Sequence, residues 1–295
     1  MTPTADEGLW DVPIVLAATP IGNLSDATTR LRELLRTAEI IAAEDTRRTR
    51  HLCRALGIIP TGSMISLHEH NESSRAQEMV ARASEGARVL VVSDAGMPSV
   101  SDPGFRLVST AAAAGVEVTV APGASAVTTA LALSALPTDA FTFAGFVPRK
   151  SADRSRLLRR LAGEEWTTVL FDSPHRIAAT LAEFVQELGA GRPAALCREL
   201  TKRHEQVLRG SLAELAEAAA TRSGEERLRG EMVLVLGGAV ADPTETPTAE
   251  DLAGVVLERV ADGEKLKTAA KGLATKHGLA SRDLYDAALR LRDRR

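Results

Sequence analysis

The stretch "RVLVVSDAGMPSVSDPG" (residues 88–104) decides the predicted fold, because an apolar run passes directly into a loop in which the pair Ser-Asp occurs twice. Positions 89–92 are all Val or Leu, and an unbroken apolar run is typical of a strand buried on both faces. Such strands form parallel sheets covered by helices on each side. The loop that follows would lie at the carboxyl edge of the sheet, where open α/β proteins bind their ligands.

Similar apolar runs recur through the first half of the chain. They are "IVLAATP" (14–20), "EIIAAED" (39–45), "MISLHEH" (64–70) and "VEVTVAP" (116–122). Between the first two, Leu31, Leu34 and Leu35 repeat with helical spacing. Strand, helix and strand in this rhythm predict an N-terminal α/β domain over residues 13–121, preceded by a tail at 1–12.

The second half predicts another α/β domain over residues 122–239. Its strand-like runs lie at 141–146, 167–174, 194–200, 204–211 and 231–238. Only "TKR" separates the third run from the fourth, which is hairpin length, so we expect a mixed sheet. The fold class is therefore α/β, with two domains.

The last part of the chain differs in composition from the rest. Residues 240–250 are rich in Pro and Thr and predict a linker. Residues 251–295 predict a small helical C-terminal segment, divided by Gly263 and Gly278. Over 263–295 there are nine Lys and Arg against four Asp and Glu. The segment would therefore either contact a polyanion or form a solvated helical appendage that packs on the body or on a partner subunit.

Composition bounds the partners and the compartment. The 295 residues carry a formal net charge of −3, so any nucleic-acid contact must be a local patch. The only cysteines, Cys53 and Cys197, form no Cys-x-x-Cys pair, which fits a reducing compartment. The N-terminus has no charged-then-apolar leader, and "PG" interrupts the uncharged run at 118–138, so we expect a cytoplasmic protein without a membrane partner.

Polar residues cluster where the predicted strands end, in seven loops that include "TPIGNL" (19–24), "EDTRRTR" (44–50) and "DSPHR" (172–176). So many loops on one rim predict a large cleft, although any one alone would be an ordinary turn. These loops contain no P-loop motif, no dinucleotide-binding fingerprint and no nucleophile-elbow motif. Strand alternation would place His68 and His70 on one face, but two histidines are too few for zinc, so we predict no metal.

Two basic runs begin at strand ends beside this cleft, at 44–54 and 148–160. We expect them to contact RNA phosphates, although a solvated helix face would have the same composition. Aromatic residues make up only 3%, so base stacking is not the expected mode. The candidate RNA-binding residues are Arg47, Arg48, Arg50, Arg149, Lys150, Arg154 and Arg156.

Taken in order, these motifs resemble the tetrapyrrole methylase family, and within it the branch of 16S rRNA cytidine 2′-O-methyltransferases. The matching strings are "ATPIGNL", "AAEDTRRTR", "HEHNE", "VSDAGMPSVSDPG", "PGASA", "ALPTDAF", "GFVPRK", "DSPHR", "RELTKRHE" and "RGSL", which span roughly residues 14–240. The chain departs from the family pattern at Asp172, where the family usually has Glu, and in "SALPTD", where it usually has "SGLPTD".

The resemblance implies S-adenosylmethionine as cofactor, bound between two α/β domains, with 16S rRNA of the small ribosomal subunit as substrate and a homodimer as assembly. It carries cofactor binding onto Pro20, Asp94, Ala95, Gly96, Ser125, Ala126, Phe171, Asp172, Gly210 and Met232. Nearby carboxylates stabilise the positive charge of a sulfonium. S-adenosylmethionine carries no phosphate, so a glycine-rich phosphate-binding loop is not required.

Methyl transfer to a ribose hydroxyl depends first on positioning. An assisting pair at the rim would be Glu199 and Lys202, with Glu44, Asp45 and His68 as alternatives. The string "RELTK" could equally form a structural ion pair. Two other functions stay open at this point: a small-molecule methyltransferase acting on a tetrapyrrole or a diphthamide precursor, and a noncatalytic RNA-binding assembly factor.

Overall fold

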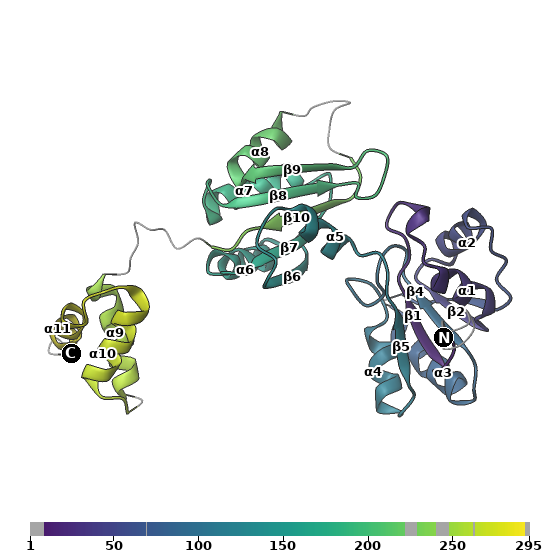
Figure 1. Cartoon of the computed structure of the whole chain (residues 1–295), viewed down its shortest axis with the longest axis horizontal. Coiled ribbons are helices and arrows are strands. Elements are labelled where there is room, and N and C mark those ends of the chain that lie inside the picture. The colour runs from purple at the N-terminus through teal and green to yellow at the C-terminus, as the bar shows by residue number, and fades with distance from the viewer. Residues whose placement is uncertain (1–8, 69, 222–228, 240–247, 262, 293–295) are drawn as a thin grey trace, which may run out of the picture. The chain divides into compact units, whose positions relative to one another are not determined.

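The computed structural model describes residues 9–68, 70–221, 229–239, 248–261 and 263–292. The chain divides into two compact units, residues 1–239 and residues 240–295. The first unit holds two five-stranded sheets and the second holds three helices (Figure 1). The α/β fold class predicted from the sequence is confirmed.

The first sheet is entirely parallel, with strand order β3-β2-β4-β1-β5. Its strands are β1 (Ile14–Ala17), β2 (Ile40–Ala43), β3 (Ser63–Ser66), β4 (Val89–Val92) and β5 (Val118–Ala121). β1, β2 and β4 are buried at every position, which agrees with their unbroken apolar sequences.

Helices cover both faces of the first sheet (Figure 1). They are α1 (Thr29–Thr37), α2 (Thr46–Ala55), α3 (Glu72–Ser84) and α4 (Phe105–Ala113), with a short 3-10 turn η1 (Leu24–Asp26) after β1. Alternate residues of β1 point to opposite faces: Val15 packs with Leu31 of α1, while Leu16 packs with Met79 of α3. The two cores fix which strand ends meet at the carboxyl edge.

The second sheet is mixed, with strand order β6-β7-β10-β8-β9, as the short connection between its third and fourth runs predicts. Its strands are β6 (Phe141–Phe146), β7 (Thr167–Asp172), β8 (Pro193–Arg198), β9 (Gln206–Ser211) and β10 (Met232–Leu236). Only β6 and β7 are parallel, and β8 and β9 form an antiparallel pair.

Four helices pack on the second sheet. They are α5 (Ala126–Leu133), α6 (Ser151–Ala162), α7 (Ile177–Leu188) and α8 (Leu212–Ala220). The last three share one core around the fully buried Phe184. α5 packs on the other face, and Ile21 from the first half joins the same cluster. Apolar packing therefore continues from one half of this unit to the other.

The second unit is built from α9 (Ala249–Ala261), α10 (Leu266–His277) and α11 (Ser281–Arg292). Its core is made of small and aliphatic side chains, with Val256, Ala269 and Leu284 fully buried. Gly278 ends α10 in the left-handed conformation, at φ +69°. The predicted linker at 240–250 lies mostly outside the described residues.

The predicted strand through His70 is wrong, because β3 ends at Ser66. The chain turns at His68, whose backbone N–H donates to Asn71 Oδ1 at 2.9 Å, and α3 begins at Glu72. His68 and His70 therefore do not share a strand face. Within the described residues, no helix is both long and apolar enough to span a bilayer.

Candidate functional site

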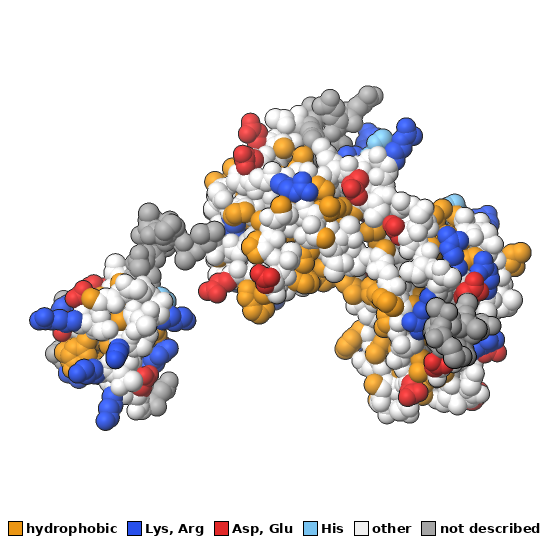
Figure 2. Space-filling view, viewed as in Figure 1, with side chains coloured by type: hydrophobic (Ala, Val, Ile, Leu, Met, Phe, Trp, Pro, Cys, Tyr) orange, Lys and Arg blue, Asp and Glu red, His pale blue; other side chains and the backbone are white. Residues whose placement is uncertain are grey.

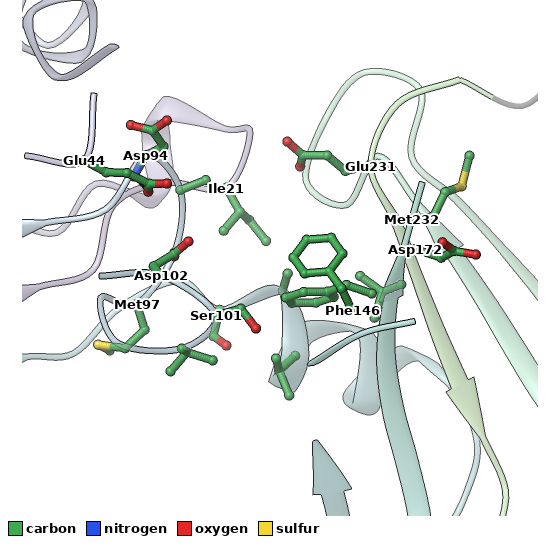
Figure 3. Close-up of a pocket in the computed structure, with 18 of the residues that line it drawn as sticks. Ile21, Glu44, Asp94, Met97, Ser101, Asp102, Phe146, Asp172, Glu231 and Met232 are labelled. Atoms are coloured by element: carbon green, nitrogen blue, oxygen red, sulfur yellow. Dashed lines mark hydrogen bonds between the residues drawn. The ribbon is translucent and has the colours of Figure 1, made fainter. Parts of the chain in front are cut away.

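A pocket of about 300 Å³ opens between the two halves of the first unit (Figure 3), a volume that lies within the range of small-molecule sites. Its first wall comes from Ile21, Glu44, Arg48, Asp94, Ala95, Gly96, Met97, Val100, Ser101 and Asp102. The other side comes from Ser125, Ala126, Val127, Phe146, Phe171, Asp172, Glu231, Met232 and Val233.

The loop after β4 is fixed at its first turn by the segment after β1. Thr19 and Gly96 exchange two backbone hydrogen bonds of 2.9 and 3.0 Å. Gly96 has φ +82°, a conformation that glycine adopts without steric cost. This bridge holds residues 94–96 along the pocket, so the backbone there can approach a ligand closely.

The far end of the same loop is anchored by Glu72 at the start of α3. This carboxylate is 6% exposed and accepts from the backbone N–H groups of Gly104 and Arg106 at 2.8 and 2.9 Å. A carboxylate at the beginning of α4 is also favoured by the helix dipole. Between the two anchors, Ser99 and Ser101 have φ of +72° and +63°, which are uncommon for residues other than glycine.

Three carboxylates line the first wall of the pocket. Figure 3 shows Glu44, Asp94 and Asp102 on the same side. The Asp94 N–H donates to Glu44 at 3.2 Å, and Arg48 lies 3.4 Å from the Asp94 carboxylate. Burial is the main cause that raises the pKa of Glu44 and of Asp94. Burial, together with the charges of Glu44 and Asp94, raises the pKa of Asp102 to about 7.

The facing wall combines aromatic rings with a satisfied carboxylate. Phe146 and Phe171 pack edge to face, with ring centroids 5.3 Å apart. Asp172 is buried and accepts from Arg176, from Thr180 Oγ1 at 2.6 Å and from the Ser173 N–H at 2.8 Å. Its charge is therefore neutralised within the second half, and we expect Asp172 to shape this wall.

A second hollow of about 710 Å³ adjoins the pocket at the start of α2. Arg48 and Asp94 line both spaces. The hollow is otherwise lined by Pro20, Gly22, Leu24, Asp45, Arg47, His51, Leu52 and Ala55. An acidic pocket thus opens beside a hollow with two arginines and a histidine.

Most of the residues predicted to bind cofactor come together in the pocket: Asp94, Ala95, Gly96, Ser125, Ala126, Phe171, Asp172 and Met232 line it. Pro20 lines the neighbouring hollow instead. Gly210 lies on the edge strand β9, close to Glu214, and is not among the residues that line the pocket. Their roles as ligands of a cofactor remain predictions.

The structure does not bring Glu199 and Lys202 into the pocket. Lys202 Nζ lies 2.8 Å from Glu199 and 3.1 Å from Glu231, and Glu199 also accepts from the Glu231 N–H. Burial opposes the charge on Glu199, but bonds from Lys202 and Glu231 outweigh it and lower the pKa. These contacts favour a structural ion pair at the strand end. Gly22 packs so closely on Lys202 that a Cβ there would collide with it.

Asp45 begins α2 and does not line the pocket. Its carboxylate accepts from the Arg47 N–H at 2.8 Å and pairs with the Arg47 guanidinium at 2.8 Å, so it caps the helix. Side-chain and backbone bonds from Arg47 hold the pKa of Asp45 well below its usual range. Among the alternatives named from the sequence, Glu44 is the one that reaches the pocket.

The basic residues fall into two groups. Arg48, Arg50, Arg149 and Lys150 are exposed, and among the described residues only Arg48 of these four is paired with an acid. Arg47 is paired with Asp45, Arg156 with Asp153, and Arg154 with Glu183 at 2.6 Å. Arg154 is half-buried in its ion pair with Glu183, so a structural role accounts for this contact without RNA.

The pocket fits S-adenosylmethionine in its chemistry. Of its five carboxylates, Asp172 and Glu231 are paired with Arg176 and Lys202, and the remaining three against Arg48 still favour a cation such as a sulfonium. Ile21, Val100 and Phe171 supply apolar surface for a nucleoside base. Residues 94–96 would hold the molecule along the first wall, and residues 125–126, Phe171 and Met232 would hold it along the other side. Within the described ranges, no three His, Cys, Asp or Glu side chains are grouped to hold a metal ion.

Sequence reasoning missed several residues of this pocket. Asp102, Phe146 and Glu231 line it without having been singled out. The repeated Ser-Asp in 93–104 was a usable signal for Asp102, because both copies belong to one loop. Phe146 lies in the matching string "GFVPRK", but no role was assigned to it, and Glu231 lies outside the matching strings. The place of both side chains depends on how the two halves pack.

The chain belongs to the tetrapyrrole (corrin/porphyrin) methylases, whose family model matches residues 13–216. Two curated relatives define the branch: the Mycobacterium tuberculosis (strain H37Rv) protein named ribosomal RNA small subunit methyltransferase I is 49% identical over 282 residues, with 95% of each chain covered. The protein of the same name from Escherichia coli O157:H7 is 39% identical, with 94% of each chain covered.

Solved structures of more distant proteins share the fold. The methyltransferase CobJ superimposes with a TM-score of 0.55 at 21% identity and covers 77% of this chain and 94% of its own. Diphthine synthase gives a TM-score of 0.55 at 16% identity over 76% of this chain and 90% of its own. A Thermus thermophilus uroporphyrin-III C-methyltransferase solved with S-adenosylhomocysteine gives 0.50 at 18% identity, covering 76% and 97%.

Proposed function

We propose that this protein transfers a methyl group from S-adenosylmethionine to the ribose 2′-hydroxyl of a cytidine in 16S rRNA of the small ribosomal subunit. The observation that carries the proposal is the junction of two spaces. An acidic pocket with apolar walls opens beside a hollow lined by arginines, and Arg48 and Asp94 belong to both. A sulfonium nucleoside fits the first space, and an RNA backbone fits the second.

The cofactor side rests on the loop after β4 and on the facing strands. Asp94 gives a carboxylate beside the expected sulfonium, and Gly96 lets the backbone come close. Ser125 and Ala126, at the start of α5, add a second loop on the other side of the pocket. Bound S-adenosylmethionine supplies an electrophilic methyl group. The residues themselves bind it, orient it and limit the access of water.

The RNA side rests on exposed cations. Arg50 of α2 and Arg149 and Lys150 before α6 have no ion pair among the described residues, and Arg48 of α2 is exposed although it pairs with Asp94. Each phosphate neutralised by such a residue releases counterions, so binding would weaken as salt rises. In the second unit, Lys267, Lys271 and Lys276 are exposed on α10, which suits a further phosphate contact.

Catalysis would come mainly from positioning. The attacking oxygen, the methyl carbon and the leaving sulfur must lie nearly in line, and fixing such a geometry can supply roughly 7–11 kcal/mol of the barrier. The pocket is suited to this because its loop is anchored at both ends, by Gly96 and by Glu72. A rigid first wall would keep the attacking hydroxyl aligned with the methyl group of the cofactor.

Other functions are less well supported. A small-molecule methyltransferase needs a deep cleft without a basic rim, whereas α2 and the segment before α6 carry one. An assembly factor without catalysis leaves the acidic pocket without a ligand. Relatives at 39–49% identity over most of the chain carry the name of an rRNA methyltransferase, which supports the same choice.

The protein would act as a cytoplasmic homodimer with no membrane partner. Exposed apolar side chains near the outer strands β5 and β6 support a second copy as the partner: Phe105 is 71% exposed, Val120 42% and Phe141 39%. Figure 2 shows hydrophobic side chains on the surface of this unit. Twofold dimers are the commonest soluble assemblies. Light scattering would measure the molar mass in solution, and we expect that of two chains.

The function is tested by labelled methyl transfer to small ribosomal subunits prepared from a strain that lacks the endogenous enzyme. We expect label in 16S rRNA, and ribose mapping should place it on one cytidine 2′-oxygen. Asp11→Asn, an exposed change outside the pocket, is the matched control and should leave transfer unchanged. Label neither in intact subunits nor in free 16S rRNA would overturn the proposal.

A further inference from the structure

Of the three carboxylates on the first wall, Asp102 is the one for which the described residues provide neither an ion pair nor a backbone N–H donor. Asp94 has Arg48 at 3.4 Å, and both Asp94 and Glu44 accept backbone N–H bonds, at 3.0 Å from Asp45 and at 3.2 Å from Asp94. No ion pair to Asp102 exists among the described residues, and the nearby Ser93 hydroxyl donates to the Gly96 carbonyl at 3.1 Å. Asp102 therefore lies in the pocket with accepting capacity left over.

The backbone conformation of the loop fixes the position of Asp102. It follows Ser101, whose φ is +63°, and precedes the turn that Glu72 anchors through the Gly104 N–H. Left-handed conformations at residues other than glycine cost of order 1–3 kcal/mol and persist where the surroundings enforce them. Figure 3 shows Asp102 beside the pocket, below Asp94. Glu72 thus acts as a positioning residue for this carboxylate.

We propose that Asp102 is the general base that accepts the proton of the RNA 2′-hydroxyl. This rests on the proposed function. The hydroxyl oxygen forms a new bond to the methyl carbon while the methyl–sulfur bond breaks. The bonding pair stays on sulfur, which leaves as neutral S-adenosylhomocysteine. The hydroxyl proton passes to a carboxylate oxygen of Asp102 and then to solvent, so charge and atoms balance.

The environment of Asp102 suits this task. A base works best when its pKa lies near the operating pH, and burial with the nearby charges of Glu44 and Asp94 raises the pKa of Asp102 to about 7. Ordinary aspartates titrate far below this range. The titratable groups that line the same pocket are Glu44, Arg48, Asp94, Asp172 and Glu231. Asp172 is held by Arg176 and Thr180, and Glu231 by Lys202, so neither has the same freedom.

The test compares wild type, Asp102→Asn and Asp102→Glu, with Asp11→Asn as an exposed control. Methyl transfer to small subunits is measured from pH 5.5 to 9 at saturating S-adenosylmethionine, and cofactor affinity is measured by calorimetry. We expect Asp102→Asn to lower kcat about 100-fold or more and to abolish the rise in rate near neutral pH. Its cofactor Kd should stay within about twofold, because only the proton acceptor is lost. Asp102→Glu should recover part of the rate.

Three results would overturn the assignment. One is an Asp102→Asn enzyme that keeps its rate and its pH profile. Another is a variant whose cofactor Kd rises more than tenfold at unchanged kcat, which would make Asp102 a cofactor ligand. The third comes from carbon-13 NMR of the wild-type protein, in which the carboxyl signal missing from Asp102→Asn titrates near 4 instead of near 7. Failure of the proposed function looks different: wild type then labels no RNA, while this signal still titrates near neutrality.

Discussion

The charge state of Asp102 should be visible in the stability of the protein without any substrate. The pKa of this group is raised from 3.8 to about 7, chiefly by burial. A group whose pKa is raised on folding contributes stability below its unfolded pKa and loses that contribution as pH rises through the folded value. Wild type should therefore lose stability between pH 4 and pH 7 for this reason. Asp102→Asn has no proton to lose and should not.

The size of the effect follows from the shift. About three pH units at about 1.4 kcal/mol each give an upper bound of about 4 kcal/mol. The pocket is open to solvent, which weakens the electrostatic part, so we expect roughly half of that. Asp102→Asn should thus be about 2 kcal/mol more stable than wild type at pH 8 and nearly equal to it at pH 4.

Urea denaturation of both proteins at pH 4, 6 and 8 measures this difference. Asp11→Asn provides the control, because Asp11 is exposed and outside the pocket. The difference between Asp102→Asn and wild type should grow with pH, while that between the control and wild type should stay flat. A difference that is constant over this range, or one that favours wild type at pH 8, would refute the assignment of a strongly raised pKa to Asp102.

Three further changes test other parts of the account. Asp94→Ala should weaken S-adenosylmethionine binding at least tenfold in calorimetry, because a carboxylate beside the sulfonium is removed; unchanged affinity would contradict it. Replacing Arg149 and Lys150 by Ala should lower RNA affinity and reduce the magnitude of the salt slope by about 1.5, with cofactor Kd unchanged. Ala135→Gly should raise the free energy of unfolding by about 1 kcal/mol, since Ala135 has φ +60° after α5; a loss of stability would count against it.

The last of these positions links the sequence to the structure. "SALPTD" departs from the usual "SGLPTD", and the replaced glycine falls on the left-handed residue that follows α5. The departure keeps the turn but gives up glycine's freedom at that φ. The other departure, Asp172, keeps its carboxylate in a network with Thr180 and the Ser173 N–H.

Periodicity was sufficient to predict the fold. Runs that are apolar at every position predicted a parallel sheet, and β1, β2 and β4 are buried throughout. The expected strands extended too far at their carboxyl ends, because polar loop residues such as His68 followed the runs directly. Polar residues that form turns end a strand, and counting apolar residues along the sequence does not locate that end.

The site was predictable by loop but not by side chain. Position after a strand marked the loops at 93–98 and 122–125, and the family resemblance singled out Asp94 and Ala126, which both line the pocket. The same reasoning favoured Glu199 and Lys202, which instead pair with each other. The direction of a loop side chain depends on local φ values and on the packing of the two halves, and one sequence carries little information on either.

The central claim is that the pocket between the two halves of the first unit binds S-adenosylmethionine beside a hollow that Arg47, Arg48 and His51 help to line. A crystal structure of the full chain grown with S-adenosylmethionine tests it most directly. We expect the nucleoside between Ala126 and Phe171, the sulfonium near Asp94, and the methyl group facing Asp102 and the hollow at α2. Cofactor density outside this pocket, or a methyl group directed away from both, would contradict the account.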